Sequence, residues 1–209
     1  MKTYSFKNGN IAYPNILKDI YSQGLESSPR GLKTKEFLHV VTEIQKPTER
    51  FLTTYNRNTN PFFLIAEALW ILAGRGDSEF IGHYNKQLLQ FKDEGHPNFH
   101  GAYGSRIRNY NMYKDGSINS TKEITIDQLD ECYKKFQKDP ETRQAVISLF
   151  NPNFDNEQTK DLPCNTTSYF KLREGKLYMS QHIRSNDINL GLFPTNLFPL
   201  LFMSAPIIW

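Results

Sequence analysis

The sequence Asp161-Leu162-Pro163-Cys164-Asn165 contains one of the two cysteines, and Arg184-Ser185-Asn186-Asp187 follows that cysteine by twenty residues. A cysteine acts as a nucleophile in its thiolate form, and a neighbouring guanidinium lowers the pKa of a thiol. An arginine followed by a serine also suits a phosphate, because a guanidinium binds it through paired hydrogen bonds. The two stretches therefore predict a nucleophile beside an anion-binding group. The alternative is that Cys164 is a small buried side chain.

The residues between these stretches have the pattern of a β-hairpin. Two strand-like segments, 166–172 and 176–182, flank the turn-forming pair Glu174-Gly175. Cys164 then precedes the first strand and Arg184 follows the second. Because the open ends of a hairpin meet at one place, we expect the thiol and the guanidinium to lie close together.

The remaining elements follow from hydrophobic periodicity and from turn residues. The expected elements are a helix that includes 16–21 and stops at Gly24, a strand over 37–44, helices over 77–91 and 127–138, a strand over 145–150, and loops over 95–116 and 151–161. Cys132 lies in the helix expected over 127–138 and is expected to be buried and inert.

Glu67 is a conspicuous residue of one further helix. Asn60-Pro61 can begin this helix, which runs through Leu72 and ends at Gly74. Its apolar residues surround it, so we expect the helix to be buried. A buried carboxylate costs free energy unless it is paired or functional. A structural ion pair and a catalytic role are both open for Glu67 on this ground alone.

The composition predicts a folded protein that acts on a small anionic molecule. The chain has 209 residues, of which 38% are hydrophobic, enough for one domain with a substantial core. Its net charge of +3 comes without basic clusters, so no nucleic-acid-binding surface is indicated. The five histidines lack metal-binding spacing, and two cysteines make no disulfide framework. No metal is expected.

Targeting signals are not visible in the sequence. The N-terminal residues lack the apolar run of a signal peptide, and no segment approaches a membrane span of about 20 residues. We therefore expect a cytoplasmic protein without membrane association.

Six blocks of the sequence resemble motifs of the thymidylate synthase family, which includes the pyrimidine nucleotide hydroxymethylases. The likeness runs from about Tyr13 to Asn196, and the order and spacing of the blocks make it specific. The blocks are Ser28-Pro29-Arg30-Gly31, Phe63–Trp70 around Glu67, Gly101–Arg106 around Tyr103, Asp139–Gln144 around Arg143, Pro163-Cys164, and Arg184–Asn196.

The resemblance implies an α/β (α+β) fold in which helices flank a large mixed twisted sheet. Residues 1–209 would form a single domain of this type that lacks the family's C-terminal portion. Two such chains would form a homodimer through the sheet face. The implied reaction is one-carbon transfer from 5,10-methylenetetrahydrofolate to C5 of a pyrimidine deoxynucleotide. Conversion of dUMP to dTMP is the first expectation, and a dUMP or dCMP hydroxymethylase is the alternative. A non-catalytic nucleotide-binding homologue is a second alternative.

The resemblance also implies roles for individual residues. Cys164 would add to C6 of the pyrimidine, Arg184 would activate it, and Glu67 would transfer protons. Tyr103 would order the site beside the ring, and Asp187 would contact the base or the folate. The implied substrate-binding residues are Arg30, Arg143, Arg184, Ser185 and Asn196, with Arg143 reaching the phosphate in a partner subunit.

A structural role is the alternative for each of these residues. The arginines can be solvated surface groups, and Tyr103 can be an ordinary aromatic among eleven tyrosines. Asp187 and Asn196 can cap turns.

Several positions depart from the family pattern. Asn165 stands where the synthases usually have histidine, Gln144 replaces a second arginine, and Ile183 stands where glutamine is frequent. The spacing from Gly191 to Asn196 is one residue longer than usual, with Phe193 as the expected insertion. Without a gap, Thr195 would hold the position of the family's asparagine. The family's sugar-binding block is not visible before Trp209, and the apolar segment 197–209 is expected to be buried.

Overall fold

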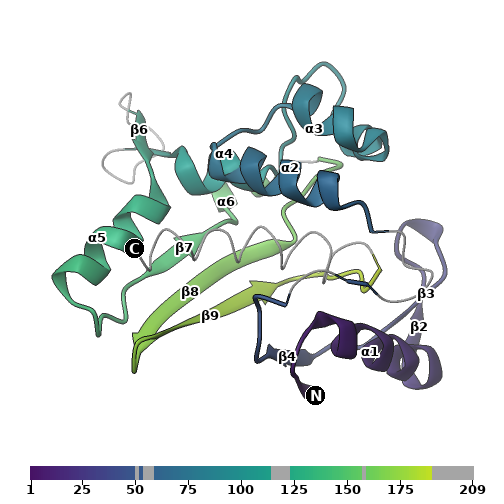
Figure 1. Cartoon of the computed structure of the whole chain (residues 1–209). Helices are drawn as coiled ribbons and strands as arrows, with labels where there is room; N and C mark the ends of the chain where they lie inside the picture. The colour runs from purple at the N-terminus through teal and green to yellow at the C-terminus, as the bar shows by residue number, and fades with distance from the viewer. Residues whose placement is uncertain (50–51, 54–58, 114–122, 157–158, 190–209) are drawn as a thin grey trace. The chain divides into compact units, whose positions relative to one another are not determined.

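A computed structural model describes residues 1–49, 52–53, 59–113, 123–156 and 159–189 (Figure 1). The helices are α1 (Gly9–Gln23), α2 (Pro61–Leu72), α3 (Ser78–Tyr84), α4 (Tyr103–Arg108), α5 (Gln128–Lys138) and α6 (Pro152–Asp155), with the 3₁₀ helices η1 (Pro29–Gly31) and η2 (Lys86–Phe91). The strands are β1 (Lys2–Phe6), β2 (Leu25–Ser27), β3 (Thr34–Glu36), β4 (Val40–Ile44), β5 (Tyr110–Tyr113), β6 (Glu123–Ile126), β7 (Val146–Ser148), β8 (Asn165–Arg173) and β9 (Lys176–Ile183).

The predicted mixed α/β class is confirmed by these elements. Among the described residues the strands form four small sheets, β1-β4, β2-β3, β5-β6 and β7-β8-β9, where one large sheet was expected. The chain divides into two compact units, Met1–Asn60 with Asp187–Phe198, and Pro61–Asn186 with Pro199–Trp209. That residues 1–209 form a single domain stays a prediction.

The first unit is built around helix α1. The side chain of Asn8 accepts a hydrogen bond from Ile11 N (3.1 Å) and so caps the helix, which ends before Gly24 as predicted. Strand β4 begins three residues later than predicted and pairs in parallel with β1, from Lys2↔Val40 to Phe6↔Ile44. The core of this unit consists of Ala12, Tyr13, Ile16 and Leu52.

The second unit contains the predicted hairpin. Strands β8 and β9 pair antiparallel from Asn165↔Ile183 to Arg173↔Lys176, with an irregularity between Asn165 and Thr167. Strand β7, shorter than predicted, pairs with β8 on its other edge. Phe170 and Ile147 are fully buried beneath this sheet. The hairpin therefore presents one face to the core and places Cys164 at its open end.

Helix α5 confirms the element predicted over 127–138. Asp127 caps it by accepting from Asp130 N (3.1 Å), and lysines occupy its last turn, where they complement the helix dipole. Leu129, Cys132 and Phe136 form its buried face, since residues three and four apart share a side of a helix.

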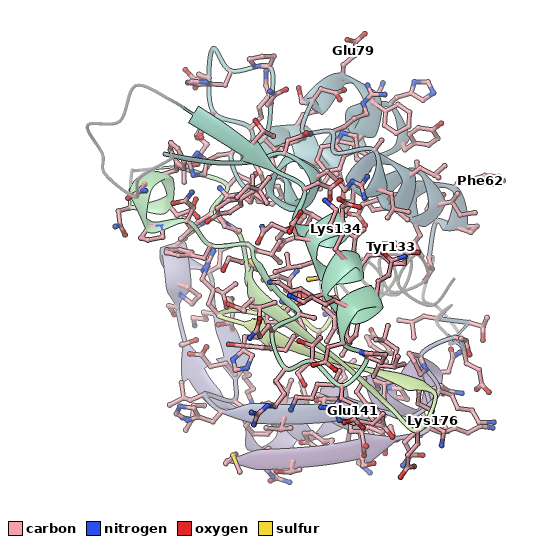
Figure 2. All side chains as sticks on the ribbon, turned by 90° about the vertical axis from the view of Figure 1, so that its left-hand side faces the viewer. Phe62, Glu79, Tyr133, Lys134, Glu141 and Lys176 are labelled. Atoms are coloured by element: carbon pink, nitrogen blue, oxygen red, sulfur yellow. The ribbon has the colours of Figure 1, made fainter. Side chains whose placement is uncertain are left out.

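Helix α2 has the predicted bounds but is not buried all round. Phe63, Leu64, Ala66, Ala68, Trp70 and Ile71 are buried, whereas Phe62, Ile65 and Leu69 are exposed on the opposite side within the described part of the chain. Figure 2 shows Phe62 at the outer side of α2. The apolar sequence therefore predicted the helix, but it did not predict which of the apolar side chains are buried, because exposed apolar residues are common at protein surfaces.

Two other predictions were wrong in detail. The helix expected over 77–91 is divided at Asn85 into α3 and η2, because the Asn85 side chain accepts from Gln87 N (3.1 Å) and starts the second segment. The region expected to be a loop over 95–116 contains α4 and β5, and the loop over 151–161 contains α6. These short elements were not predicted, because their polar and glycine-rich sequences are typical of loops.

No helix of the described residues is both long enough and apolar enough to cross a bilayer.

Candidate active site

Cys164 lies immediately before β8, and its half-buried thiol faces a guanidinium group. Arg184 follows β9, and its Nη2 stands 3.8 Å from Sγ of Cys164. The backbone N of Arg184 donates to Cys164 O (2.9 Å), which closes the open end of the hairpin. The predicted juxtaposition of thiol and guanidinium is therefore confirmed. The positive charge of Arg184 therefore lies beside the sulfur of Cys164.

The guanidinium of Arg184 is held by the segment that carries the cysteine. Its Nε donates to Pro163 O (2.9 Å) and its Nη2 donates to Leu162 O (2.8 Å). Among the described residues its Nη1 has no partner, so two of the five N–H donors of the group remain for a ligand. Arg184 can thus serve the thiol and an anion together.

The hydroxyl of Tyr103 fixes the backbone on the other side of the thiol. It accepts from Cys164 N (3.2 Å) and from Asn165 N (3.1 Å). Burial raises the pKa of Tyr103 to about 12, so the phenol is neutral. The structure places Tyr103 next to the nucleophile. The predicted position of Tyr103 beside the pyrimidine ring stays a prediction.

Asp161 is a site-supporting residue that the sequence analysis missed. Its Oδ2 accepts from Gly101 N (2.8 Å), and burial raises its pKa above the ordinary value. A Cβ at Gly101 would stand 2.6 Å from Asp161 O and 3.1 Å from the carboxylate oxygens, so only glycine permits this approach. The tyrosine block and the cysteine segment are joined here.

The segment before Asp161 is attached at a further point. Thr159 Oγ1 donates to Asp93 Oδ2 (2.7 Å), and Lys160 N donates to Asp93 Oδ1 (3.0 Å). Four groups, from Asp93, Gly101, Tyr103 and Arg184, therefore hold the seven residues that end at Asn165. A nucleophile on a loop becomes accurately placed when the loop is held in this way.

A buried ion cluster, also missed, supports helix α4. The guanidinium of Arg106 donates to both oxygens of Asp155, with Nη1–Oδ2 2.6 Å and Nη2–Oδ1 2.7 Å. It also donates to Leu149 O and to His100 O. Burial raises the pKa of Asp155, but hydrogen bonds from Arg106 and Asn151 lower it below its ordinary value overall. Asp155 lies within the loop predicted over 151–161, and nothing in its sequence spacing points to Arg106.

We predict that Asp155→Ala destabilises the protein by about 3–5 kcal/mol, because it leaves the Arg106 charge buried without its partner. Urea denaturation of the two proteins would measure the change. Asp130→Ala is the control, since it removes an exposed ion pair with Lys134 (2.7 Å) that water screens. Equal stability losses in the two variants would contradict this account of Asp155.

Glu67 lies on α2 with one carboxylate oxygen buried. Part of the residue is accessible, but Oε2 is buried and has no hydrogen-bond partner among the described residues. Burial alone raises the pKa of Glu67 to about 8. The expected structural ion pair is not seen in the described part of the chain. A carboxyl group with a pKa near neutrality suits proton transfer.

The roles of the other predicted site residues stay predictions. Ser185 is exposed directly after Arg184. Arg30 and Asp187 belong to the first unit, where Asp187 Oδ1 accepts from Asn189 N (2.7 Å) as a turn-capping residue would. Asn196, together with Gly191, Phe193, Thr195 and the segment 197–209, lies outside the described residues.

Arg30 has an uncommon backbone conformation. Its φ of 54° lies in the left-handed region, followed by Gly31 at 78°, between the paired strands β2 and β3. A non-glycine residue in this region costs roughly 1–2 kcal/mol. Such strain is often found at functional positions, so the conformation is compatible with the predicted phosphate-binding role.

The fold and the site define a mixed α/β protein with a cysteine and an arginine at the open end of a hairpin. The family model described as thymidylate synthase matches residues 11–204. The chain therefore belongs to the thymidylate synthase family.

Individual relatives agree with this assignment. A protein of Bacillus phage SP01 named deoxyuridylate hydroxymethyltransferase is 43% identical over 199 residues, 94% of this chain and 51% of that protein. One of the same name from Pseudomonas phage M6 is 31% identical, over 94% of this chain and 53% of that protein. A Methanosarcina barkeri protein provisionally named thymidylate synthase is 26% identical, over 93% of this chain and 78% of that protein. The chain spans about half the length of the phage relatives.

Proposed function

We propose that the protein transfers a one-carbon unit to C5 of deoxyuridine monophosphate. The observation that carries this proposal is the Cys164 thiol held 3.8 Å from Nη2 of Arg184, in a chain of the thymidylate synthase family. Phage relatives are named for acting on deoxyuridylate, which supports uracil as the base. A carboxamide at Asn196, the predicted base-reading residue, would also suit uracil.

The chemistry starts at C6 of the pyrimidine. Addition of the Cys164 thiolate to C6 makes C5 an enolate carbon, which can then attack an electrophilic carbon. The C5 proton is then lost as the bond between the transferred carbon and its carrier breaks. Water, or hydride from the folate, captures the exocyclic carbon, and expulsion of the thiolate restores the ring. Glu67 is proposed to exchange protons with the ring oxygen and C5, and Tyr103 to order the base. Covalent addition thus replaces one difficult step by easier ones.

The proposed carbon donor is 5,10-methylenetetrahydrofolate. The residues fit such a donor, since Cys164 and Glu67 can generate a carbon nucleophile but no side chain carries an electrophilic one-carbon group. The folate supplies this group when bound. Asp187 is proposed to contact the base or the folate.

The nucleotide phosphate is proposed to bind to Arg30, Arg143, Arg184 and Ser185. The unengaged Nη1 of Arg184 and the neighbouring Ser185 offer donors of the required kind. Gln144 replaces an arginine of the family pattern, so the phosphate should bind less tightly than in a complete site.

The position of Arg143 supports a homodimer. Arg173, at the far end of β8 from Cys164, donates to Glu141 O (2.8 Å), so the Arg143 loop lies at that far end. Nine strand residues correspond to roughly 27 Å, which is too far for an arginine to reach the thiol of its own chain. Arg143 can then serve a phosphate only in a partner subunit, and a two-fold dimer through the exposed sheet face would supply one.

Two products are compatible with the site. Hydroxymethylation, in which water captures the exocyclic carbon, is favoured by the names of the two phage relatives. Asn165 and Ile183 also differ from the usual synthase residues beside the nucleophile, where ordered water matters. Methylation to dTMP, ranked first from the sequence, is favoured by the Methanosarcina barkeri relative.

The proposal is tested by incubating the chain with dUMP and 5,10-methylenetetrahydrofolate and measuring the product mass. We expect a hydroxymethyl product, and a methyl product would assign the second function. Parallel incubation with dCMP tests the base. A chain that binds dUMP but forms neither product would instead support a non-catalytic homologue.

We predict that Arg143→Ala lowers the affinity for dUMP by about 1.5–3 kcal/mol, because it removes a charged contact to the phosphate. Hybrid dimers of Arg143→Ala and Cys164→Ala chains should regain one intact site and form product. Titration calorimetry and product assays measure the two effects. Hybrids that are no more active than either parent would show that Arg143 does not cross the interface.

A further inference from the structure

The loop that carries Arg143 is held by several hydrogen bonds, more than an exposed connection needs. It joins α5 to β7 through Asp139–Gln144. Thr142 N donates to Asp139 O (3.0 Å), Glu141 N donates to Asp139 Oδ1 (2.9 Å), and Gln144 N donates to Thr142 Oγ1 (3.2 Å). Thr142 is only 8% exposed, so the turn has its own buried anchor.

Two cationic side chains donate hydrogen bonds to backbone carbonyls on either side of Arg143. Lys135, in the last turn of α5, donates from Nζ to Gln144 O (3.0 Å). Arg173, at the end of β8, donates from Nη2 to Glu141 O (2.8 Å) and from Nη1 to its neighbour Leu172 O (2.7 Å). Both side chains are half-buried. Figure 2 shows Glu141 of the loop close to Lys176, the hairpin residue that pairs with Arg173.

Arg143 itself is exposed and forms no hydrogen bond or ion pair with the described residues. Ordering an exposed loop costs conformational entropy, and this order gives Arg143 no partner among the residues that the structure describes. A side chain that is presented on a fixed backbone binds a ligand more tightly, because less freedom is lost on binding. The construction of the loop therefore suits a ligand outside the subunit.

We propose that Lys135 and Arg173 are positioning residues, which hold the loop so that Arg143 is presented to the nucleotide phosphate in the partner subunit. This inference rests on the proposed function, in which Arg143 acts across a dimer interface. It adds that each subunit prepares the phosphate site of its partner through two cations that do not touch the phosphate. The effect of either residue must then appear in the partner's site and not in its own.

The first test replaces each cation without shortening the side chain much. Arg173→Gln and Lys135→Gln should weaken dUMP binding roughly tenfold, the loss of one charged hydrogen bond. Deoxyuridine, which lacks the phosphate, should show no such change. Arg173→Lys and Lys135→Arg keep a cationic donor and should restore most of the affinity. Lys138→Gln is the matched control, because Lys138 lies in the same helical turn, is exposed and has no bond among the described residues.

The second test locates the effect in one subunit or the other. Cys164 is the marker, since only a site with this thiol can form a covalent adduct with a 5-fluoropyrimidine deoxynucleotide and the folate. Hybrid dimers of Arg173→Gln and Cys164→Ala chains have one Cys164, in the chain that lacks Arg173. If the loop acts across the interface, this site receives an intact loop and forms adduct at wild-type nucleotide concentrations. Arg173→Gln homodimers should need roughly tenfold more nucleotide for the same extent of adduct.

The outcomes separate this inference from the function on which it rests. Unchanged dUMP affinity in both glutamine variants would overturn the positioning role. A defect that persists in the hybrid, while Arg143→Ala is rescued in the same experiment, would show a local structural effect of Arg173 in its own chain. A wild-type chain that forms no adduct would overturn the proposed function and the inference with it. An Arg143→Ala variant without rescue would show that Arg143 does not cross the interface, which overturns the inference but leaves the proposed reaction standing. If Arg173→Gln fails to fold, the Lys135→Gln variant provides the same test in hybrid dimers with Cys164→Ala chains.

Discussion

Cys164→Ala is expected to abolish covalent capture of a 5-fluoropyrimidine deoxynucleotide, whereas Cys132→Ala leaves capture intact. Fluorine at C5 cannot leave as a proton does, so the covalent intermediate formed through C6 accumulates. The thiol is the only group at the hairpin opening that the proposed mechanism uses for this bond. We expect turnover of dUMP to fall by about 10³-fold or more, as it does when other enzymes lose their nucleophile. Mass spectrometry of the intact protein measures the adduct.

Cys132 is a suitable internal control because its chemistry differs. It is fully buried on α5, and burial raises its pKa to about 11, so that it is a neutral thiol at physiological pH. Neutral buried thiols are poor nucleophiles. An adduct in the Cys164→Ala variant, or its loss in Cys132→Ala, would refute Cys164 as the nucleophile.

The sequence predicted the hairpin and the thiol–guanidinium pair because both depend on local patterns. Strand composition around Glu174-Gly175 fixed the pairing of β8 with β9, and the ends of a hairpin must meet. The same reasoning predicted α5, whose buried residues recur at helical spacing. Helix caps and turn residues are read from neighbours in the sequence, so such elements can be found without the fold.

The groups that hold the site could not be predicted in this way. Asp161 meets Gly101 across sixty residues, and Arg106 meets Asp155 across forty-nine. Neither pair has a spacing rule, because their contact depends on how α4 and the cysteine segment pack. The one available signal was that Gly101 and Arg106 stand inside a block that resembles a family motif. The roles of Arg30, Asp187 and Asn196 stay predictions.

Glu67→Gln is expected to make the protein more stable at alkaline pH and less active at every pH. The pKa of Glu67 is about 8 in the folded protein, against an ordinary value of 4.5 in an unfolded chain. Because the folded state holds the proton more tightly, the contribution to stability is complete below pH 4.5. It is lost as the pH rises through 8, when the buried carboxyl must ionise.

The difference between the two pKa values sets the size of this effect. It corresponds to about 5 kcal/mol of unfolding free energy lost between pH 4.5 and pH 8 in the wild type, an upper value for the advantage of glutamine at pH 9. Near pH 5 the two proteins should have similar stability, since both carry a neutral side chain. Urea denaturation at the two pH values measures the change. Glu79→Gln, at an exposed position on α3, should shift stability by no more than about 0.5 kcal/mol at either pH.

Activity should change in the opposite direction. Glutamine fits the same space but carries no transferable proton, so the rate of product formation should fall by about 10²–10⁴-fold, the usual contribution of a general acid–base group. The wild-type rate should itself decline with an apparent pKa near 8 if the protonated carboxyl is the required form. A variant that gains alkaline stability but keeps full activity would show that Glu67 is buried for another reason. If Glu67→Gln gains no stability at alkaline pH, burial does not raise the pKa of the Glu67 carboxyl in the folded protein. The stability and activity measurements together therefore distinguish two roles of Glu67. Either its buried carboxyl lowers stability but transfers protons in the reaction, or it is a buried residue of α2 without a part in the reaction.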